Sequence, residues 1–160
     1  MVNPTLQKLW APLRSSFWFL PTLMALGSGL LAIALVMLDE TYANAWLQSQ
    51  VWARGWIYGG DAEGASDVLG IIAGSMIAMA GVVFSMTLVA LSLASSQFGP
   101  RLLRNFMRDR VNQAVLGTFI STFLYSLLVL RSIRHGGDVA FVPHISVSVS
   151  LMLALLSLGV

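Results

Sequence analysis

Long apolar blocks separated by short polar segments dominate the chain. The first block runs from Phe17 to Leu38 without a charge, and as a helix it is about 33 Å long, enough to cross a bilayer. The second, Val68 to Ala94, is about 40 Å long as a helix, so we expect it to tilt or to extend its polar end into water. The third stops at Arg131. The pattern predicts an all-α integral membrane protein, a four-helix transmembrane bundle with spans at about 17–38, 68–94, 114–131 and 145–160.

The composition excludes a water-soluble globular protein. Apolar residues make up 57% of the 160 residues and charged residues 10%, and the mean hydropathy is +0.80. The chain contains no cysteine, which excludes a disulfide framework, a thiolate metal site and a cysteine nucleophile. Because the fourth block is still apolar at Val160, we expect residues 1–160 to form one transmembrane domain of a longer protein whose soluble carboxy-terminal region is absent.

The first block has an alternative interpretation as a cleaved signal peptide, because basic residues precede it and Ala43-Asn44-Ala45 resembles a cleavage site. Its length favours a retained span, since the apolar region of a signal peptide has about 7 to 15 residues. The tryptophans also lie outside the deep part of the blocks, as interfacial anchors do. Between Tyr42 and Trp56 they alternate with polar residues, so we expect a short interfacial amphipathic helix there.

The basic residues predict the orientation of the helices. Lys8 and Arg14 precede the first span, Arg54 lies in the first loop, and the second and third loops carry four and two basic residues. One side therefore carries six and the other three, and the positive-inside rule places the amino terminus and the second loop in the cytoplasm. The net charge of +2 does not indicate a nucleic-acid-binding protein, because the basic residues are confined to short segments beside apolar blocks.

The second block carries two rows of small or hydroxyl side chains. Gly70, Gly74 and Ala78 are four residues apart, with Gly81 on an adjoining row, and this spacing lets helix backbones approach closely. We favour packing within one chain, and packing around the axis of a homo-oligomer stays open. Further along, small and hydroxyl side chains form a stripe on nearly one face of the helix. The stripe either lines a water-filled path or packs against another helix. The stripe comprises Gly81, Ser85, Ser92 and Ser96.

The third block has hydroxyl side chains at helical spacing on an otherwise apolar helix. These are Thr118, Ser121, Thr122 and Tyr125. We favour hydrogen bonds from the hydroxyls to backbone carbonyls or neighbouring helices over a conduction or substrate path, which remains the alternative. No ionisable side chain lies deep in any block, so proton-driven transport through these spans is not expected.

A bend follows the second block, because Gly99-Pro100 ends one helix and Pro100 can begin the next. Beyond it, apolar side chains and arginines alternate at helical spacing, which predicts a second short amphipathic helix at the inner membrane surface. We expect this segment to bind anionic lipid; the alternatives are a ligand-phosphate site and a lever that couples the cytoplasm to the bundle. We name the segment the elbow; it comprises Gln97, Gly99, Pro100, Arg101, Arg104, Arg108 and Arg110.

Two loop segments contain residue types that bind metals but lack convincing ligand spacing. Asp61 to Asp67 has three carboxylates without an EF-hand pattern, and we favour Ser66 or Asp67 as the N-cap of the second span. His135 and His144 are expected to be solvated loop residues rather than zinc ligands. The chain contains no catalytic triad, HExxH helix, phosphate-binding glycine loop or nucleotide fingerprint, so we expect no metal, cofactor or catalytic residue.

One long segment of the chain resembles a known family. Residues 80–134 read AGVVFSMTLVALSLASSQFGPRLLRNFMRDRVNQAVLGTFISTFLYSLLVLRSIR. This segment, together with the acidic stretch at 61–65, resembles a bacterial family of predicted integral membrane proteins, domain of unknown function 2254. The resemblance implies four amino-terminal spans in the bacterial inner membrane, followed by a sizeable soluble region. It implies no established activity, so no catalytic residue is carried over.

Two functions from different classes fit these features. The first, which the sequence features favour, is an oligomeric channel or transporter-like pore, in which the second and third spans supply polar stripes gated from the elbow. The second is a non-catalytic membrane anchor, scaffold or sensor that presents a cytoplasmic carboxy-terminal domain, in which the stripes only pack. The expected partners are the lipid bilayer and further copies of the chain. Stripes buried against neighbouring helices favour the anchor, whereas a ring with a stripe facing its axis favours conduction.

Overall fold

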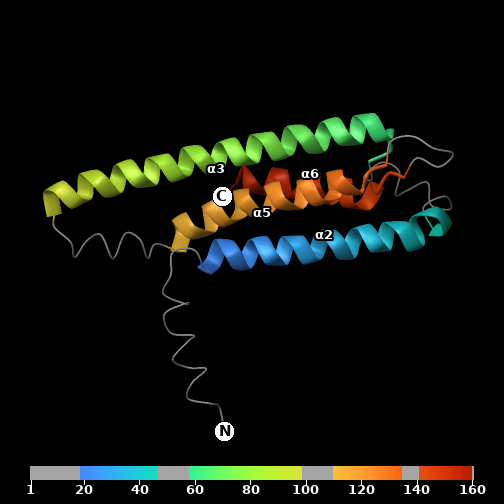
Figure 1. Ribbon diagram of the computed structural model, residues 1–160, viewed down its shortest axis with the longest axis horizontal. Coiled ribbons are helices and arrows are strands. Elements are labelled where there is room, and N and C mark those ends of the chain that lie inside the picture. The colour runs from blue at the N-terminus through green and yellow to red at the C-terminus, as the bar shows by residue number, and fades with distance from the viewer. Residues whose placement is uncertain (1–18, 47–57, 99–109, 135–140, 160) are drawn as a thin grey trace, which may run out of the picture.

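Four α-helices, successive ones running in opposite directions, make up most of the part of the chain that the structure describes. The computed structural model describes residues 19–46, 58–98, 110–134 and 141–159. The helices are α2 (Phe19–Trp46), α3 (Ala62–Phe98), α5 (Arg110–Ser132) and α6 (His144–Ser157). Helices α3 and α6 begin at the end of the bundle where α2 and α5 finish (Figure 1). We name this the α6 end, and the opposite one, where α3 finishes and α5 begins, the elbow end.

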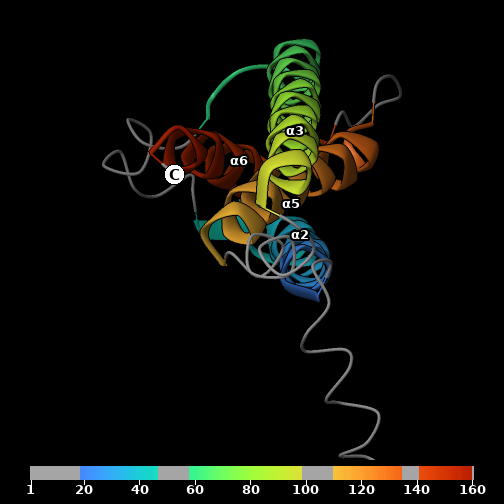
Figure 2. The same ribbon diagram turned by 90° about the vertical axis from the view of Figure 1, so that its left-hand side faces the viewer.

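Helix α5 is the central helix of the bundle. Seen end-on, it lies between α2 on one side and α3 and α6 on the other (Figure 2). The most apolar part of α5 is 44% buried, against 17% for α2 and 11% for α3. Both hydrophobic clusters contain its residues: Tyr125 and Val129 in one, Leu116 and Phe119 in the other. Side chains on α5 as a whole are therefore more enclosed than those on the other long helices.

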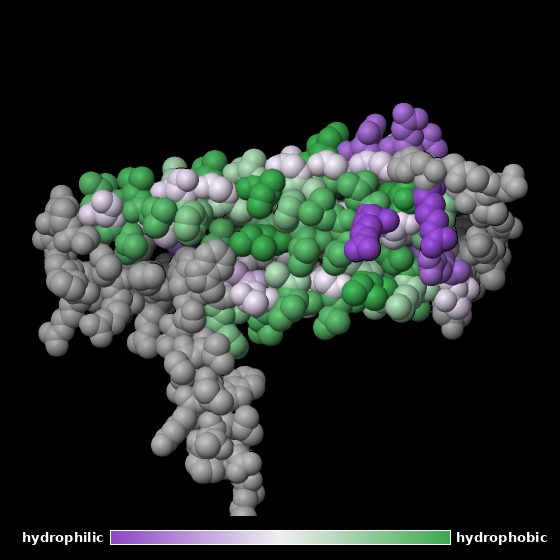
Figure 3. All heavy atoms as spheres, viewed as in Figure 1, coloured by the Kyte–Doolittle hydropathy of each residue, from purple (hydrophilic) through white to green (hydrophobic). Residues whose placement is uncertain are grey.

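The outward surfaces of the helices are apolar. Leu30 in α2, Met86 in α3 and Leu155 in α6 are 71%, 70% and 68% exposed. Apolar side chains cover the length of the bundle, and hydrophilic ones gather at the α6 end (Figure 3). Large apolar side chains that face outward along whole helices are expected where lipid, rather than water, surrounds a protein.

The predicted all-α fold is confirmed for the described residues, and three of the four predicted spans are helices long and apolar enough to cross a membrane. They cover Phe19–Thr41, Ala62–Leu93 and Arg110–Ser132. As predicted for the second span, α3 exceeds the bilayer thickness, with 37 residues and a length of about 55 Å. The fourth helix, α6, has 14 residues, so it is about 21 Å long, shorter than the hydrocarbon core. Its full crossing stays a prediction.

Helix α3 begins earlier than the sequence analysis predicted. The Oδ1 atom of Asp61 accepts a hydrogen bond from the backbone N–H of Gly64 at 3.0 Å, so Asp61 is the N-cap. The prediction of Ser66 or Asp67 as the cap is wrong, because the acidic segment is itself the first turn of the helix. The hydroxyl of Ser66 donates to the carbonyl of Ala62 at 2.8 Å, which is a mid-helix bond.

The two predicted amphipathic helices fall largely outside the described residues. Residues 42–46, the first part of the segment that ends at Trp56, continue α2 instead of starting a new helix. The second predicted amphipathic helix follows α3. Helix α3 finishes at Phe98, directly before the predicted break at Gly99-Pro100. The amphipathic character of both segments stays a prediction.

Candidate functional site

The hydroxyl side chains predicted for α5 include one at the centre of the bundle. Tyr125 is fully buried in a cluster with Ala32 of α2, Leu69 of α3 and Val147 of α6. Its hydroxyl donates a hydrogen bond to the backbone carbonyl of Ser146 in α6, with an oxygen–oxygen distance of 3.0 Å. Tyr125 therefore joins α5 to α6 within one chain.

Two further serines, which the sequence analysis did not single out, extend this contact. The hydroxyl oxygens of Ser126 in α5 and Ser150 in α6 are 2.8 Å apart, and both side chains are fully buried. One turn earlier, Thr122 is 1% exposed, and its Oγ1 atom has no hydrogen-bond partner among the described residues. We name this set the polar seam; it comprises Thr122, Tyr125, Ser126, Ser146 and Ser150.

Thr118 and Ser121, the other two predicted hydroxyl positions, bond to their own helix. The Thr118 hydroxyl donates to the carbonyl of Ala114 at 2.9 Å, and the Ser121 hydroxyl donates to the carbonyl of Thr118 at 3.0 Å. Both side chains are half-buried. Such bonds satisfy a hydroxyl in an apolar setting without a partner helix or water.

A buried carboxylate lies beside the seam near the α6 end. Asp39 of α2 is 1% exposed. Its Oδ2 atom accepts hydrogen bonds from the backbone N–H and the hydroxyl of Ser146, at 2.9 and 2.7 Å, and its Oδ1 atom accepts one from the N–H of Ile145 at 3.2 Å. Ser146 thus contacts Asp39 of α2 and Tyr125 of α5 at once.

The first span predicted from the sequence ends at Leu38, directly before Asp39, and this boundary is too early. Helix α2 continues to Trp46, and its candidate span includes Asp39 and ends at Thr41. Donors from α6 satisfy the oxygens of this carboxyl group inside the bundle. An ionisable side chain therefore lies within a candidate span, where none was expected.

Two aromatic side chains meet beside the first turn of α6. The rings of Tyr58 and His144 are stacked with their centroids 6.4 Å apart, and the backbone N–H of Tyr58 donates to the Ser148 hydroxyl at 2.8 Å. His144 is half-buried, and its Nδ1 atom is buried without a hydrogen-bond partner in the described part of the chain. Burial raises the pKa of the Tyr58 hydroxyl, and the charges of Asp61 and Asp67 raise it further, so Tyr58 is neutral at physiological pH.

The small residues of α3 lie on its outer surface. Gly70, Gly74 and Ala78 are exposed, and a Cβ atom built on either glycine meets nothing within 4 Å. Within one chain, α3 packs through a different row of side chains. That row comprises Ala65, Leu69, Ile72, Ala73, Met76 and Ala80.

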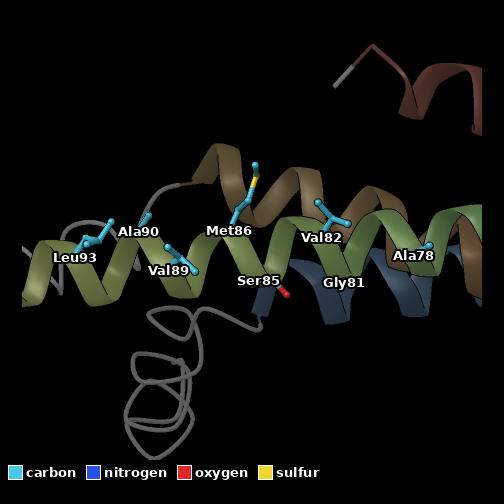
Figure 4. A pocket seen from close by; sticks show the side chains of 8 residues that line it. All are labelled: Ala78, Gly81, Val82, Ser85, Met86, Val89, Ala90 and Leu93. Carbon is cyan, nitrogen blue, oxygen red and sulfur yellow. The ribbon is translucent and has the colours of Figure 1, made fainter.

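A shallow groove of about 680 Å³ runs along the exposed face of α3. Figure 4 shows that the side chains lining it come from α3 alone, and it includes Gly81 and Ser85 of the predicted stripe. Ser92 is also exposed but does not line the groove. Ser96 lies in the last turns of α3, where the backbone alone is described.

Most of the elbow lies outside the described residues. This holds for Gly99, Pro100, Arg101, Arg104 and Arg108; Gln97 lies in the last turn of α3. Arg110 begins α5 and is exposed. Next to the elbow end, the side-chain amide of Asn112 donates to the Thr87 hydroxyl at 2.9 Å, which ties α5 to α3.

Comparison with known proteins agrees with the architecture. The family described as "Predicted membrane protein (DUF2254)" matches residues 14–160. The chain is 40% identical over 153 residues to uncharacterized proteins of Mycobacterium bovis and Mycobacterium tuberculosis. The matched region covers 92% of this chain and 27% of each relative, so the chain spans about a quarter of the length of the curated relatives it matches. No solved structure matches the chain.

Proposed function

The chain belongs to the DUF2254 family of predicted membrane proteins, and we propose that it is a non-conducting membrane anchor for the rest of a longer protein. The observation that supports this proposal is the enclosure of the polar seam. Tyr125 and Ser126 bond across to α6, so these groups are satisfied by protein within one chain. Relatives almost four times as long as the matched region provide the kind of attached region that an anchor would hold.

We further propose that the anchor lies in the bacterial inner membrane with its amino terminus and the elbow in the cytoplasm. The distribution of basic residues supports this orientation. In this orientation the arginines of the elbow lie beside the inner leaflet. Each basic residue near an anionic surface contributes about 1 kcal/mol of attraction, so anionic lipid is the proposed ligand of the elbow.

A second candidate function, an oligomeric channel or transporter-like pore, is favoured by the open face of α3. The small side chains of Gly70, Gly74 and Ala78 would let a second copy approach closely. A ring assembled through this face would bring Ser85 and Ser92 towards a shared axis. We rank this function second, because the seam on α5 faces neighbouring helices and is not available to line the path.

Ion flux through the reconstituted chain distinguishes the two functions. We expect liposomes that contain the purified chain to show no more flux of small ions than empty liposomes, under applied voltage or osmotic tension. Flux that disappears in the Ser85→Leu variant would contradict the anchor and support the pore. The Leu30→Phe variant, altered at a lipid-facing position of α2, is the matched control.

A further inference from the structure

The outer face of α3 carries small side chains that packing within the described part of the chain does not require. Gly70, Gly74 and Gly81 are exposed, and a Cβ atom built on any of them meets nothing within 4 Å. Glycine is among the least favourable residues in a helix interior, so these three weaken α3 without a compensating contact to the other described helices. Ala78 and Ser85 continue the same face towards the elbow end. We name these five residues the outer row.

The hydroxyl group of Ser85 is a second, independent feature of this face. Elsewhere on α3, the hydroxyls of Ser75 and Thr87 donate to the carbonyls four residues earlier, both at 2.8 Å. The Ser85 hydroxyl forms no hydrogen bond within the described part of the chain, and its side chain lines the groove (Figure 4). A polar group that faces lipid without a partner is costly, because the hydrocarbon core provides neither donors nor acceptors. The occupant of the groove is therefore expected to carry a hydrogen-bonding group of its own.

A second copy of the chain meets these requirements. Two copies inserted in the same orientation are related by a two-fold axis along the membrane normal, so a residue near the axis meets its own equivalent at the same depth. Glycine then faces glycine, and the Ser85 hydroxyl, which is both a donor and an acceptor, can bond to the Ser85 hydroxyl of the second copy. No charged side chain lies between Val68 and Ala94, so the contact buries no charge.

We propose that α3 forms the contact of a two-fold symmetric homodimer, in which the outer rows of two copies cross between Ala78 and Ser85. Glu63 and Asp67 lie on the same side of α3 near its start, and repulsion between equivalent carboxylates keeps the two starts apart. Small residues at a spacing of four favour a right-handed crossing of about −40°, which separates the charged ends. This goes beyond the proposed anchor, because it sets the number of anchored regions at two.

Disulfide cross-linking in proteoliposomes tests the contact, since the chain has no native cysteine. A disulfide requires Cβ atoms about 3.5–4.5 Å apart, a separation that equivalent residues reach only near the crossing point. Ala78→Cys and Ser85→Cys should therefore form covalent dimers on mild oxidation. Met79→Cys, at the adjacent exposed position on another side of α3, should stay monomeric. Cross-linking of Met79→Cys at the same rate would indicate random collision and would overturn the proposal.

The strength of association gives a second test that does not depend on cysteine. Energy transfer between full chains labelled at the amino terminus, followed as the chains are diluted in lipid, gives a dimer dissociation constant. Gly81→Val should raise this constant about tenfold, as expected for an overpacked contact. Ser85→Ala should raise it about threefold, the average effect of one hydrogen bond between membrane helices.

Gly27→Val on α2 is the matched control, because Gly27 is also exposed and a Cβ atom there meets nothing within 4 Å. This variant should leave the dissociation constant unchanged. Wild-type chains that stay monomeric in lipid, or equal weakening by the two valine substitutions, would overturn the proposal. Assembly of more than two copies, or association that requires a different membrane protein, would also overturn it. Ion flux is measured separately, so the dimer and the non-conducting anchor can fail independently.

Discussion

Replacing Tyr125 with alanine is expected to destabilise the bundle by about 3–5 kcal/mol, the range for removal of a buried aromatic ring. The ring lies in the cluster that unites α2, α3 and α6 around α5, so its removal leaves a cavity that all four helices border. The substitution also removes the hydroxyl that donates to the backbone carbonyl of Ser146. The free energy of unfolding, measured by steric trapping or by denaturation in mixed micelles, gives the loss.

The control for this substitution is Tyr125→Phe, which keeps the ring and removes only the hydroxyl. Hydrogen bonds between membrane helices contribute about 0.6 kcal/mol on average, so this variant should lose about 1 kcal/mol or less. If the ring is packed inside the bundle, the alanine variant should therefore lose much more unfolding free energy than the phenylalanine variant. Similar, small losses for both would indicate that the ring is not enclosed by the bundle.

Replacing Gly117 with valine is expected to force α2 and α5 apart. A Cβ atom on Gly117 would lie 3.2 Å from the backbone Cα of Pro21 and 2.6 Å from the sulfur of Met24. The Met24 side chain can move, but the backbone of Pro21 cannot move without displacing the start of α2. Overpacking of this kind costs about 1–3 kcal/mol, measured as above.

Gly74→Val is the matched control, because it changes the same residue type within a helix. A Cβ atom on Gly74 meets nothing within 4 Å, so the isolated chain should lose little or no stability. Equal destabilisation by the two substitutions would contradict the close approach of α2 to α5. If Gly74→Val instead lowers the oligomeric state without affecting the unfolding of dilute chains, the open face of α3 is a contact between copies.

The sequence predicts the elements of the fold better than their contacts. Apolar length was sufficient to predict three spans, because each must cross the same hydrocarbon thickness. The fourth block was also predicted to be a span, but α6 is shorter than that thickness, so its full crossing stays a prediction. The start of α3 was misplaced because carboxylates in a first turn and a carboxylate at an N-cap are both favourable, and spacing alone does not distinguish them.

The candidate site was only partly predictable from the sequence. The spacing of Thr122 and Tyr125 indicated a polar face on α5, and the signal for Ser126 was its position one turn beyond Thr122. Asp39 could not be recognised, because its role depends on donors from α6 that are remote in sequence. Likewise, the spacing of Gly70 and Gly74 predicted a surface for close approach, but not that α3 would pack through another row.

Accessibility of introduced cysteines to a water-soluble methanethiosulfonate reagent tests whether the polar groups of α5 are enclosed by a lipid-embedded bundle. The chain has no native cysteine, so single substitutions can be read without background. In proteoliposomes, Glu63→Cys at the exposed start of α3 should react rapidly, whereas Thr122→Cys and Ser126→Cys in the buried seam should not. Reaction of the two seam cysteines at rates close to that of Glu63→Cys would show that water reaches α5, and would contradict an enclosed seam.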